Sequence, residues 1–419
     1  MRVAVLGAGV VGLTTAWCLA DDGHEVVVID RGDGPAAGAS RANGAQLSFS
    51  YVAPLAAPSV IAKLPALILE RESPLRLYPQ LDPQLWAWCA RFLAACTRQQ
   101  AAETTVRLLT LSFYSRRVLD DLLAREAIAF HHAHAGKLVV YSDAEGLSGA
   151  RAQLEFQKTL GCEQDLLDTE GCLAVEPALH HVRDRLVGGV FTRSDSAGDC
   201  KRFCDELAGR IARRSPTSEF RFDTAVQGLE VAGRRVTAVR TDKGRVEADA
   251  VVLALGVGSR HLARSVGFDL PIYPLKGYSI TVPVARDAAA PRVSVTDSLH
   301  KIVYARLGDR LRAAGIADLA GHDESIDRTR LALLVERARS TFPEAGDYVD
   351  ASPWAGLRPA TPRGTPILGR SPLENLFLNV GHGALGFTLA AGAARAVADV
   401  VGGRTPATPL NGLTLDSAA

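Results

Sequence analysis

The chain has 419 residues, of which 47% are hydrophobic and 22% charged, and its formal net charge is +1. Because a single hydrophobic core rarely grows beyond about 250–300 residues, this length predicts two domains. The near-neutral charge leaves no electrostatic footprint of the kind that nucleic-acid binding needs, so we expect no nucleic-acid partner.

The first thirty residues have the pattern of a βαβ unit. A short apolar run at 3–6 is typical of a parallel strand buried on both faces. Residues 13–22 predict a helix that ends at Gly23, because glycine is favoured directly after a helix. A β-branched run at 24–30 predicts the second strand.

A GxGxxG motif, formed by Gly7, Gly9 and Gly12, lies between the first strand and the helix. The first glycine permits a tight turn, the second lets the backbone approach a pyrophosphate, and the third lets the helix pack closely against the strand. Free N–H groups at the helix N-terminus attract phosphate, and Asp30 at the end of the second strand can accept hydrogen bonds from a ribose. The unit therefore predicts dinucleotide binding.

Further helices and strands follow along the chain. Apolar residues at helical spacing predict helices at 84–97, 103–128 and 198–215. Strands are predicted at 136–143, as a meander over 220–259, and at 270–284 and 294–319. A final apolar helix at 384–401 contains two charged residues, so we expect it in the core and not across a membrane. There is no long polar linker, which suggests that the chain crosses between its domains more than once.

Two features favour a flavin over a nicotinamide cofactor. Small and polar residues at 40–46 follow the second strand closely and can line a deeply buried ring. Glycine-rich turns recur far along the chain, at 254–259 and 379–392. A buried flavin needs the backbone to approach from several such segments.

With these motifs, the sequence resembles the FAD-dependent amino-acid oxidase and dehydrogenase superfamily that includes D-amino-acid oxidase and glycine oxidase. Within it, the chain is most similar to the bacterial D-amino-acid dehydrogenases of the small-subunit type. The resemblance covers essentially the whole chain and includes "NGAQLSFSYVAPLAAP", "GDCKRFC", "PLKGYSITVPV" and "WAGLRPATPRGTPILG".

The resemblance implies an α/β fold, α+β overall, with a Rossmann-like FAD-binding domain and an antiparallel-sheet substrate domain. The chain would cross between them several times. The FAD-binding domain would comprise residues 1–80, 195–270 and 350–419, and the substrate domain residues 81–194 and 271–349.

The resemblance also implies a set of cofactor-binding residues. The ADP half would be held by Gly7, Gly9, Gly12 and Asp30, and the flavin half would lie near Ser40, Arg41, Asn43 and Gln46. Val226 would contact the adenine side, Gly256 the pyrophosphate side, and Gly383, Gly386 and Thr388 the flavin pyrimidine. The remaining expected cofactor neighbours are Val10, Val11, Arg31 and Leu47.

Two local features of the sequence bear on the flavin. The subgroup more often has "AGQ" where this chain has "GAQ" at 44–46. Members with covalent flavin use a cysteine near the C-terminal segment, whereas the last cysteine here is Cys204. We therefore expect non-covalent FAD.

Arg358 is the leading candidate for substrate binding. Its planar guanidinium can bind a carboxylate through two hydrogen bonds, and the surrounding prolines and glycines stiffen the backbone. The resemblance agrees, since superfamily members use a GxRP-type arginine for the substrate carboxylate. The alternative from the residues alone is a structural arginine paired with an acidic side chain.

Other candidate contacts are less distinctive. Tyr51, Tyr278 and His382 are placed near the flavin by the segments that carry them, and each could instead serve packing or cofactor binding. The three histidines in "HHAHAG" lack a carboxylate or cysteine partner, so we expect a surface loop and no metal site. The apolar stretch 59–70 predicts a buried element, with a substrate entry or a contact to a membrane quinone pool as alternatives.

The resemblance implies oxidative deamination of D-amino acids to 2-oxo acids and ammonia. A hydride would pass from the substrate α-carbon to flavin N5, and the electrons would go to a quinone or another non-oxygen acceptor. An oxidase or dehydrogenase of glycine, sarcosine or D-hydroxyproline is the first alternative; a pyridine-nucleotide dehydrogenase and a non-catalytic flavoprotein are the others.

The sequence also bears on location. The seven cysteines include no CxxC pair, which favours a reducing compartment. The N-terminus leads directly into the first strand, so we expect no signal peptide. We predict a cytoplasmic enzyme, with peripheral contact to the inner face of the cell membrane as the alternative, and make no prediction of its oligomeric state.

Overall fold

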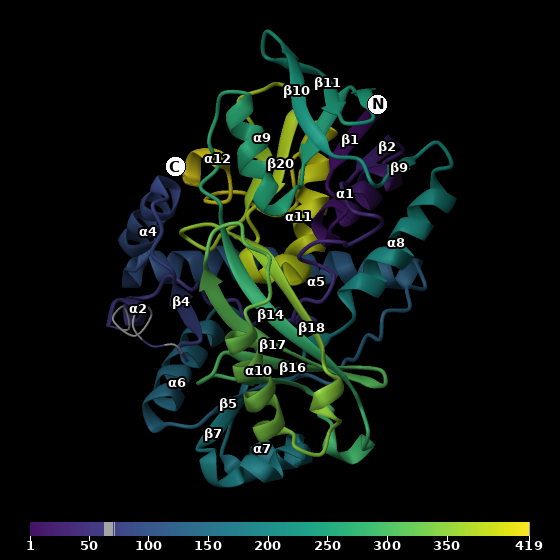
Figure 1. The fold of residues 1–419 in the computed structure, drawn as a ribbon. Coiled ribbons are helices and arrows are strands. Elements are labelled where there is room, and N and C mark those ends of the chain that lie inside the picture. The colour runs from purple at the N-terminus through teal and green to yellow at the C-terminus, as the bar shows by residue number, and fades with distance from the viewer. Residues whose placement is uncertain (63–69, 71, 419) are drawn as a thin grey trace.

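The computed structural model describes residues 1–62, 70 and 72–418. Two large sheets dominate it and occupy the upper and lower halves of the view in Figure 1. The long strands β14 and β18 reach from the lower sheet towards the upper one. The cofactor and substrate residues predicted from the sequence lie mainly where these two halves meet.

The upper sheet has six strands in the order β19-β20-β13-β1-β2-β9, and all neighbours are parallel except β19 and β20. Its strands are β1 (Arg2–Leu6), β2 (Glu25–Ile29), β9 (Glu219–Arg221), β13 (Ala250–Leu253), β19 (Ile367–Arg370) and β20 (Leu376–Val380). Alternate residues of β1, β2 and β13 belong to two different core clusters, one on each face. Coverage of both faces explains why these strands are apolar throughout.

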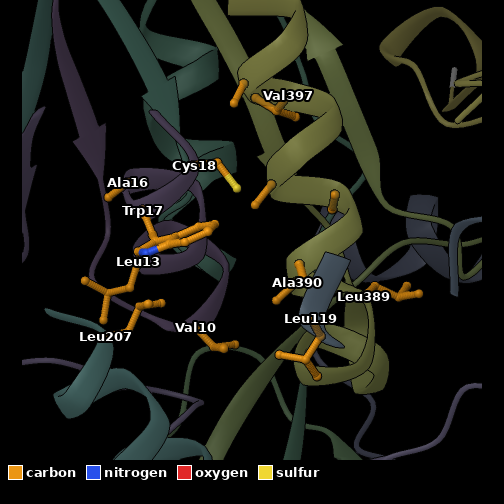
Figure 2. Packing of buried hydrophobic residues seen from close by; sticks show 14 of the residues in the cluster. Val10, Leu13, Ala16, Trp17, Cys18, Leu119, Leu207, Leu389, Ala390 and Val397 are labelled. Atoms are coloured by element: carbon orange, nitrogen blue, oxygen red, sulfur yellow. The ribbon is translucent and has the colours of Figure 1, made fainter. Parts of the chain in front are cut away.

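Four helices cover one face of this sheet: α1 (Val10–Asp21), α5 (Arg98–Arg125), α8 (Cys200–Arg214) and α11 (Gly386–Val401). Figure 2 shows α1 and α11 side by side, with Leu119 of α5 and Leu207 of α8 completing the cluster. The opposite face packs against α9 (Ser259–Ser265) and a small antiparallel sheet of β10 (Val226–Ala232), β11 (Arg235–Thr241) and β12 (Gly244–Glu247).

The lower sheet has nine strands in the order β18-β14-β17-β16-β15-β5-β7-β6, with β4 also paired to β17. They are β4 (Leu75–Leu77), β5 (Lys137–Tyr141), β6 (Asp165–Leu167), β7 (Gly188–Thr192), β14 (Tyr273–Pro283), β15 (Ser294–Asp297), β16 (Ile302–Leu307), β17 (Arg310–Leu319) and β18 (Ser352–Ala360). Most pairs are antiparallel; β15–β5 and β17–β4 are parallel.

The two faces of this lower sheet differ in character. One face, which we call the core face, packs on α7 (Thr169–Val175), η1 (Pro177–Arg185) and α10 (Arg328–Thr341) through residues such as Ile280 and Val282 of β14. The other face, which we call the site face, carries Gly277, Ser279 and Thr281 of the same strand, because neighbouring side chains alternate along a strand.

The remaining elements are short or peripheral. They are β3 (Gln46–Leu47), β8 (Ser196–Ala197), α2 (Pro58–Ala62), α4 (Pro83–Ala95), α6 (Ala144–Lys158), α12 (Leu415–Ala418), η2 (Gly256–Gly258), η3 (Asp287–Ala289), η4 (Tyr348–Asp350) and η5 (Gly383–Leu385). β3 and β8 pair with each other, which ties the predicted flavin loop to the segment before α8.

The mixed α/β architecture agrees with the sequence prediction, although details differ. The first helix begins at Val10 and not at residue 13, so it starts directly after Gly9. Strands β4 and β18 lie in segments that we assigned to the FAD-binding domain, yet both pair within the nine-stranded sheet. The division into five segments therefore stays a prediction, and these two strands depart from it, as does α5, which lies in the segment 81–194 but covers the six-stranded sheet.

Two apolar segments were singled out from the sequence. The helical segment 383–401 is long and apolar enough to cross a membrane by length and composition, but 67% of it is buried, and α11 packs in the core as expected. The stretch 59–70 is described only at its start, within α2, and at residue 70. The prediction for 63–69 lies outside the described residues.

Candidate active site

The first βα turn brings three backbone segments into close contact. Gly7 has φ +111°, and a Cβ on it would lie 2.4 Å from the carbonyl oxygen of Ala254. A Cβ on Gly12 would lie 1.9 Å from the carbonyl oxygen of Gly7. Both glycines are therefore required by the path of the chain itself.

The N-terminus of α1 opens from this turn with free hydrogen-bond donors. Val10 N donates to Ser40 Oγ at 3.1 Å, whereas the N–H groups of Gly9, Val11 and Gly12 have no acceptor among the described residues. Free N–H groups and the positive end of a 12-residue helix together suit an anion such as a pyrophosphate.

Asp30 lies beside this turn at the end of β2. Its carboxylate accepts hydrogen bonds from the N–H groups of Ala8 at 2.6 Å and Gly32 at 2.7 Å. These bonds hold the turn together and leave other lone pairs for a ligand hydroxyl. The neighbouring Arg31 points into solvent, where it approaches Glu324 at 3.5 Å, so the structure does not bring it to the turn.

Two later glycine turns lie against strand β18. Gly256 in η2 and Gly383 in η5 have φ of +58° and +53°, and the space where each Cβ would stand is open. Both turns neighbour β18, and an isolated backbone bridge joins Ala360 of β18 to His382. The segments 254–259 and 379–392 predicted from the sequence therefore meet at one place. Val226 begins β10 and is partly buried.

The loop at 40–47 covers the site face of the nine-stranded sheet. Ser279 Oγ donates to the carbonyl oxygen of Ala42 at 2.7 Å, and Asn43 Oδ1 accepts from Ala45 N at 2.9 Å. Gln46 Nε2 donates to Ser294 Oγ at 2.7 Å. These bonds fix the loop whose residues we expect near the flavin. Arg41, in the same loop, is exposed.

The order of residues 44 and 45 has a structural reason. A Cβ on Gly44 would lie 2.9 Å from Val303 Cγ2, so this position is sterically tight. Ala45 adopts φ +59°, which an alanine tolerates at a cost of about 1–2 kcal/mol. Leu47 is fully buried, and Thr388 Oγ1 accepts from Ser48 N at 3.1 Å.

Arg358 lies on β18 opposite Leu275 of β14, on the site face. A Cβ on Gly277 would lie 2.3 Å from one of its terminal nitrogens, so the guanidinium occupies the space that a side chain would fill. Within the described part of the chain, Arg358 has neither a hydrogen bond nor an ion pair. Burial lowers its pKa, and the charge of Asp318 raises it in part. Such an unsatisfied guanidinium suits a carboxylate ligand.

Trp354 and Gly277 are site residues that the sequence interpretation missed. Trp354 shares a face of β18 with Arg358, and its ring lies where a Cβ on Gly356 would stand, 2.1 Å from that position. Trp354 lies four residues before Arg358, and Gly277 pairs with Gly356, two residues before it. Their roles depend on strand pairing, which the sequence alone does not specify.

Our assignment of Tyr278 to the substrate site is corrected by the structure. Tyr278 is 1% exposed on the core face, where its hydroxyl donates to Asp318 Oδ2 at 2.9 Å. It therefore points away from Arg358. Period-two alternation of apolar residues at 276–282 was the signal that could have shown this.

His382 and Tyr51 lie in buried polar surroundings. His382 is 3% exposed, its Nε2 has no hydrogen-bond partner among the described residues, and burial lowers its pKa to about 3. It is therefore a neutral imidazole beside the end of β18. The Tyr51 ring lies 4.0 Å from the ammonium of Lys137, and burial raises the pKa of its hydroxyl.

The histidine-rich segment does not form a shared ligand set. His132 contacts Ser196 Oγ at 3.0 Å, and its ring lies 3.9 Å from that of His134. In the described ranges there is no group of three or more His, Cys, Asp or Glu side chains placed to hold a metal ion.

Comparisons with known proteins identify the family. The model of the family described as "FAD dependent oxidoreductase" matches residues 2–400. The chain belongs to this family. FAD is therefore its cofactor, as the resemblance implied.

Similar proteins extend over nearly the whole chain. It is 49% identical to D-amino acid dehydrogenase 2 of Ralstonia nicotianae, over 97% of this chain and 98% of that protein. It is 45% identical to D-amino acid dehydrogenase of Paramagnetospirillum magneticum, over 99% and 98%. Among solved structures, glycine oxidase from Geobacillus kaustophilus has a TM-score of 0.77 at 22% identity, covering 99% of this chain and 98% of its own. L-proline dehydrogenase from P. horikoshii has a TM-score of 0.74 at 17% identity, covering 99% and 96%. These structural likenesses concern the fold.

The residues present fit FAD. The free N–H groups at the start of α1 and the open sides of Gly256 and Gly383 form a cradle that side chains would fill. The N-termini of η5 and of α11 have no side-chain cap, and the positive end of α11 suits a negatively charged group. The individual contacts to FAD remain predictions.

Proposed function

We propose that the protein catalyses FAD-dependent oxidative deamination of D-amino acids to 2-oxo acids and ammonia. The observation that carries this proposal is the unsatisfied guanidinium of Arg358 at the meeting point of two glycine turns. The names of the relatives at 49% and 45% identity support the D-amino acid as substrate. When bound, FAD supplies the hydride acceptor.

The chain's own residues bind and orient the substrate in this proposal. Arg358 receives the carboxylate through two parallel hydrogen bonds, and the missing side chain of Gly277 leaves it the room to do so. The Trp354 ring then borders the side-chain end of the substrate. His382, held neutral by burial, contributes a polar nitrogen without adding charge.

An anaerobic screen tests the proposal. D- and L-amino acids are added to the purified flavoprotein, and bleaching of the flavin is followed by absorbance. We expect D-amino acids to bleach it and L-amino acids not to. Bleaching by glycine or sarcosine alone would instead support the oxidase alternative, and a protein that no amino acid reduces would refute the proposal.

Arg358 itself is tested by substitution. Arg358→Leu removes hydrogen bonds to a charged group worth about 1.5–3 kcal/mol, which corresponds to a tenfold to roughly 150-fold loss in kcat/KM. Arg358→Lys keeps the charge but loses the planar pair of donors that binds a carboxylate through two hydrogen bonds. We therefore expect KM to rise in both variants while FAD stays bound. Arg151→Leu, an exposed position on α6, is the matched control. Unchanged kinetics in Arg358→Leu would remove this assignment.

We further propose that electrons leave to a quinone or another non-oxygen acceptor, and that the protein contacts a membrane peripherally. Several large apolar side chains are exposed around α2 and α4: Leu55, Ile61, Leu81, Trp86 and Leu93. Reoxidation by a quinone analogue should be much faster than by oxygen. Co-sedimentation with lipid vesicles should weaken in a Leu81→Glu/Trp86→Glu variant; equal sedimentation would refute the contact.

A further inference from the structure

Lys137 is a buried lysine on the same face of the nine-stranded sheet as Arg358. It is 1% exposed on β5, and its direct pairing with Ser294 places both side chains on the site face, while Leu138 and Val140 enter the opposite core. Burying a charged lysine is costly unless its donors are satisfied. Its surroundings therefore call for an explanation.

The Lys137 ammonium is bound by the loop that we expect beside the flavin. Its Nζ donates to Gln46 Oε1 and Ser48 Oγ, each at 2.9 Å, and stands 4.0 Å from the centre of the Tyr51 ring. Gln46 and Ser48 flank Leu47, and Ser48 N donates to Thr388 Oγ1 at the start of α11. Lys137 thus contacts Gln46 directly and is linked to Thr388 through Ser48. Both Gln46 and Thr388 are predicted cofactor neighbours.

Asp195 is the nearest source of negative charge, but it does not close an ion pair with Lys137. No carboxylate of the described residues lies within 4.0 Å of Nζ. Asp195 is 1% exposed, and its Oδ1 accepts from Phe49 N at 2.8 Å and Ser50 N at 3.3 Å. Its Oδ2 is buried without a hydrogen-bond partner in the described chain.

A cavity of about 210 Å³ connects Asp195 with the surface. Phe49, Asp195 and Ser196 line its inner part, and the exposed Asp120, His134 and Arg193 line its mouth. A cavity of this size with polar walls accommodates several waters. Solvent protons can therefore reach the surroundings of Asp195.

Burial shifts the pKa values of both groups towards neutrality. Burial lowers the pKa of Lys137 to about 7, against the opposing effect of Asp195. Burial raises the pKa of Asp195 to about 6, against the opposing effects of Lys137, two backbone N–H groups and Arg116. The other titratable or charged groups facing the pair are Tyr51, Tyr141, Cys162, His132, His134, Asp120 and Arg193.

We propose that Lys137 and Asp195 form a proton-holding pair that takes up one proton from solvent when the bound FAD is reduced, and releases it on reoxidation. Two electrons and one proton enter the cofactor as the hydride and leave a negative charge on it. The further proton comes from solvent and binds the lone pair of Lys137 Nζ, where the charge of Asp195 stabilises it. This inference rests on the proposed placement of Gln46 and Thr388 at the flavin, and it makes Lys137 a positioning residue.

The test is the midpoint potential of the flavin in the holoenzyme, measured between pH 5.5 and 9 with dithionite and a reference dye. Each proton taken up with two electrons adds about 30 mV per pH unit to the slope, because a tenfold change in equilibrium corresponds to 29.6 mV for a two-electron couple. We expect two protons per reduction near neutral pH. The absorbance of the reduced flavin shows whether the second proton is on the flavin itself.

Substitutions separate charge from structure. In Lys137→Met the extra proton is lost, and the midpoint potential follows the one-proton line that the wild type shows at alkaline pH. In Lys137→Arg the extra proton is also lost, but the midpoint potential follows the line that the wild type shows at acidic pH, because arginine stays charged. Asp195→Asn shifts the two-proton window to lower pH. Lys201→Met, which removes an exposed lysine paired with Asp205, leaves the wild-type profile unchanged.

Each outcome decides the question. If the midpoint potential of the unmodified protein has a one-proton slope across the whole pH range, the inference is overturned without any variant. A two-proton slope that persists in Lys137→Met also overturns it. So does a reduced-flavin spectrum that places the second proton on the flavin. Because dithionite supplies the electrons, failure of every amino acid to bleach the flavin would refute the proposed function and leave this inference standing.

Discussion

Gly277→Ala should impair substrate binding while leaving the fold intact. The added Cβ would lie 2.3 Å from one terminal nitrogen of Arg358, 2.4 Å from its central carbon and 2.7 Å from the other nitrogen. Contacts between such atoms are optimal near about 3.5–4.0 Å, so the guanidinium must move by roughly 1 Å. The cost to stability is small, since the moving atoms are the end of a flexible side chain.

The cost to function is larger. A misplacement of about 1 Å in a positioning group lowers rates by roughly a hundredfold, and loss of one charged hydrogen bond costs about 1.5–3 kcal/mol. We therefore expect kcat/KM for a D-amino acid to fall about 10- to 100-fold. FAD content and melting temperature should stay near the wild-type values. Gly149→Ala, an exposed α6 site with open space around its Cβ, is the matched control.

A double-mutant cycle shows whether Gly277 acts through Arg358. If it does, Gly277→Ala should add almost nothing in an Arg358→Leu background, because the group that it displaces is already absent. Independent, additive losses in the double variant would refute the reasoning. So would an unchanged kcat/KM in the single Gly277→Ala variant.

Three further predictions concern stability and the cofactor. The pKa of His382 in the folded protein is about 3, below the ordinary value of 6.5. Between these two pH values the unfolded chain binds more protons than the folded one, so the free energy of unfolding falls as pH falls through this window. The free energy of unfolding changes by at most about 1.4 kcal/mol per pH unit. Urea unfolding of His382→Asn should show a shallower acid dependence, and parallel curves would contradict this. Ala45→Gly should relieve the left-handed backbone and stabilise by up to about 1 kcal/mol, whereas Gly44→Ala should destabilise through its contact with Val303; thermal melting that reverses this order would exclude the explanation. Acid precipitation should release all flavin, because no cysteine follows Cys204; a yellow pellet would show a covalent bond.

Local backbone requirements were the most predictable part of the fold. Gly7 and Gly12 were assigned their tasks from spacing alone, and both approach other backbone atoms as those tasks require. The long helix predicted at 103–128 is α5, Arg98–Arg125, displaced by a few residues because its N-cap Thr97 lies outside the apolar pattern. The sheet that a strand joins was less predictable: β18 pairs with β14, and nothing local in 352–360 specifies that partner.

The candidate site was predictable where a single residue type carries the chemistry. Arg358 stood out through its charge among prolines and glycines. Tyr278 was placed on the incorrect face, although the apolar alternation of its strand contained the correction. Lys137 and Asp195 gave no signal, because their partners are distant in sequence: Lys137 bonds Gln46 and Ser48, and Asp195 bonds the N–H groups of Phe49 and Ser50.

A comparison of two arginines supports the proposal that Arg358 is the substrate receptor. Arg312 is buried and Arg358 half-buried on the site face of the nine-stranded sheet, and neither has a carboxylate within 4.0 Å among the described residues. The chain satisfies Arg312 itself: Nε donates to Thr281 Oγ1 at 3.0 Å and Nη1 to the carbonyl oxygen of Asn43 at 3.5 Å. Arg358 has no such bonds, yet its position is held open by Gly277. Arg358 is half-buried, and its donors, which have no partner in the described chain, are free to bind a ligand. The unfilled hydrogen bonds of Arg358, more than its charge, are the reason why we propose it as the binding site of an anionic substrate.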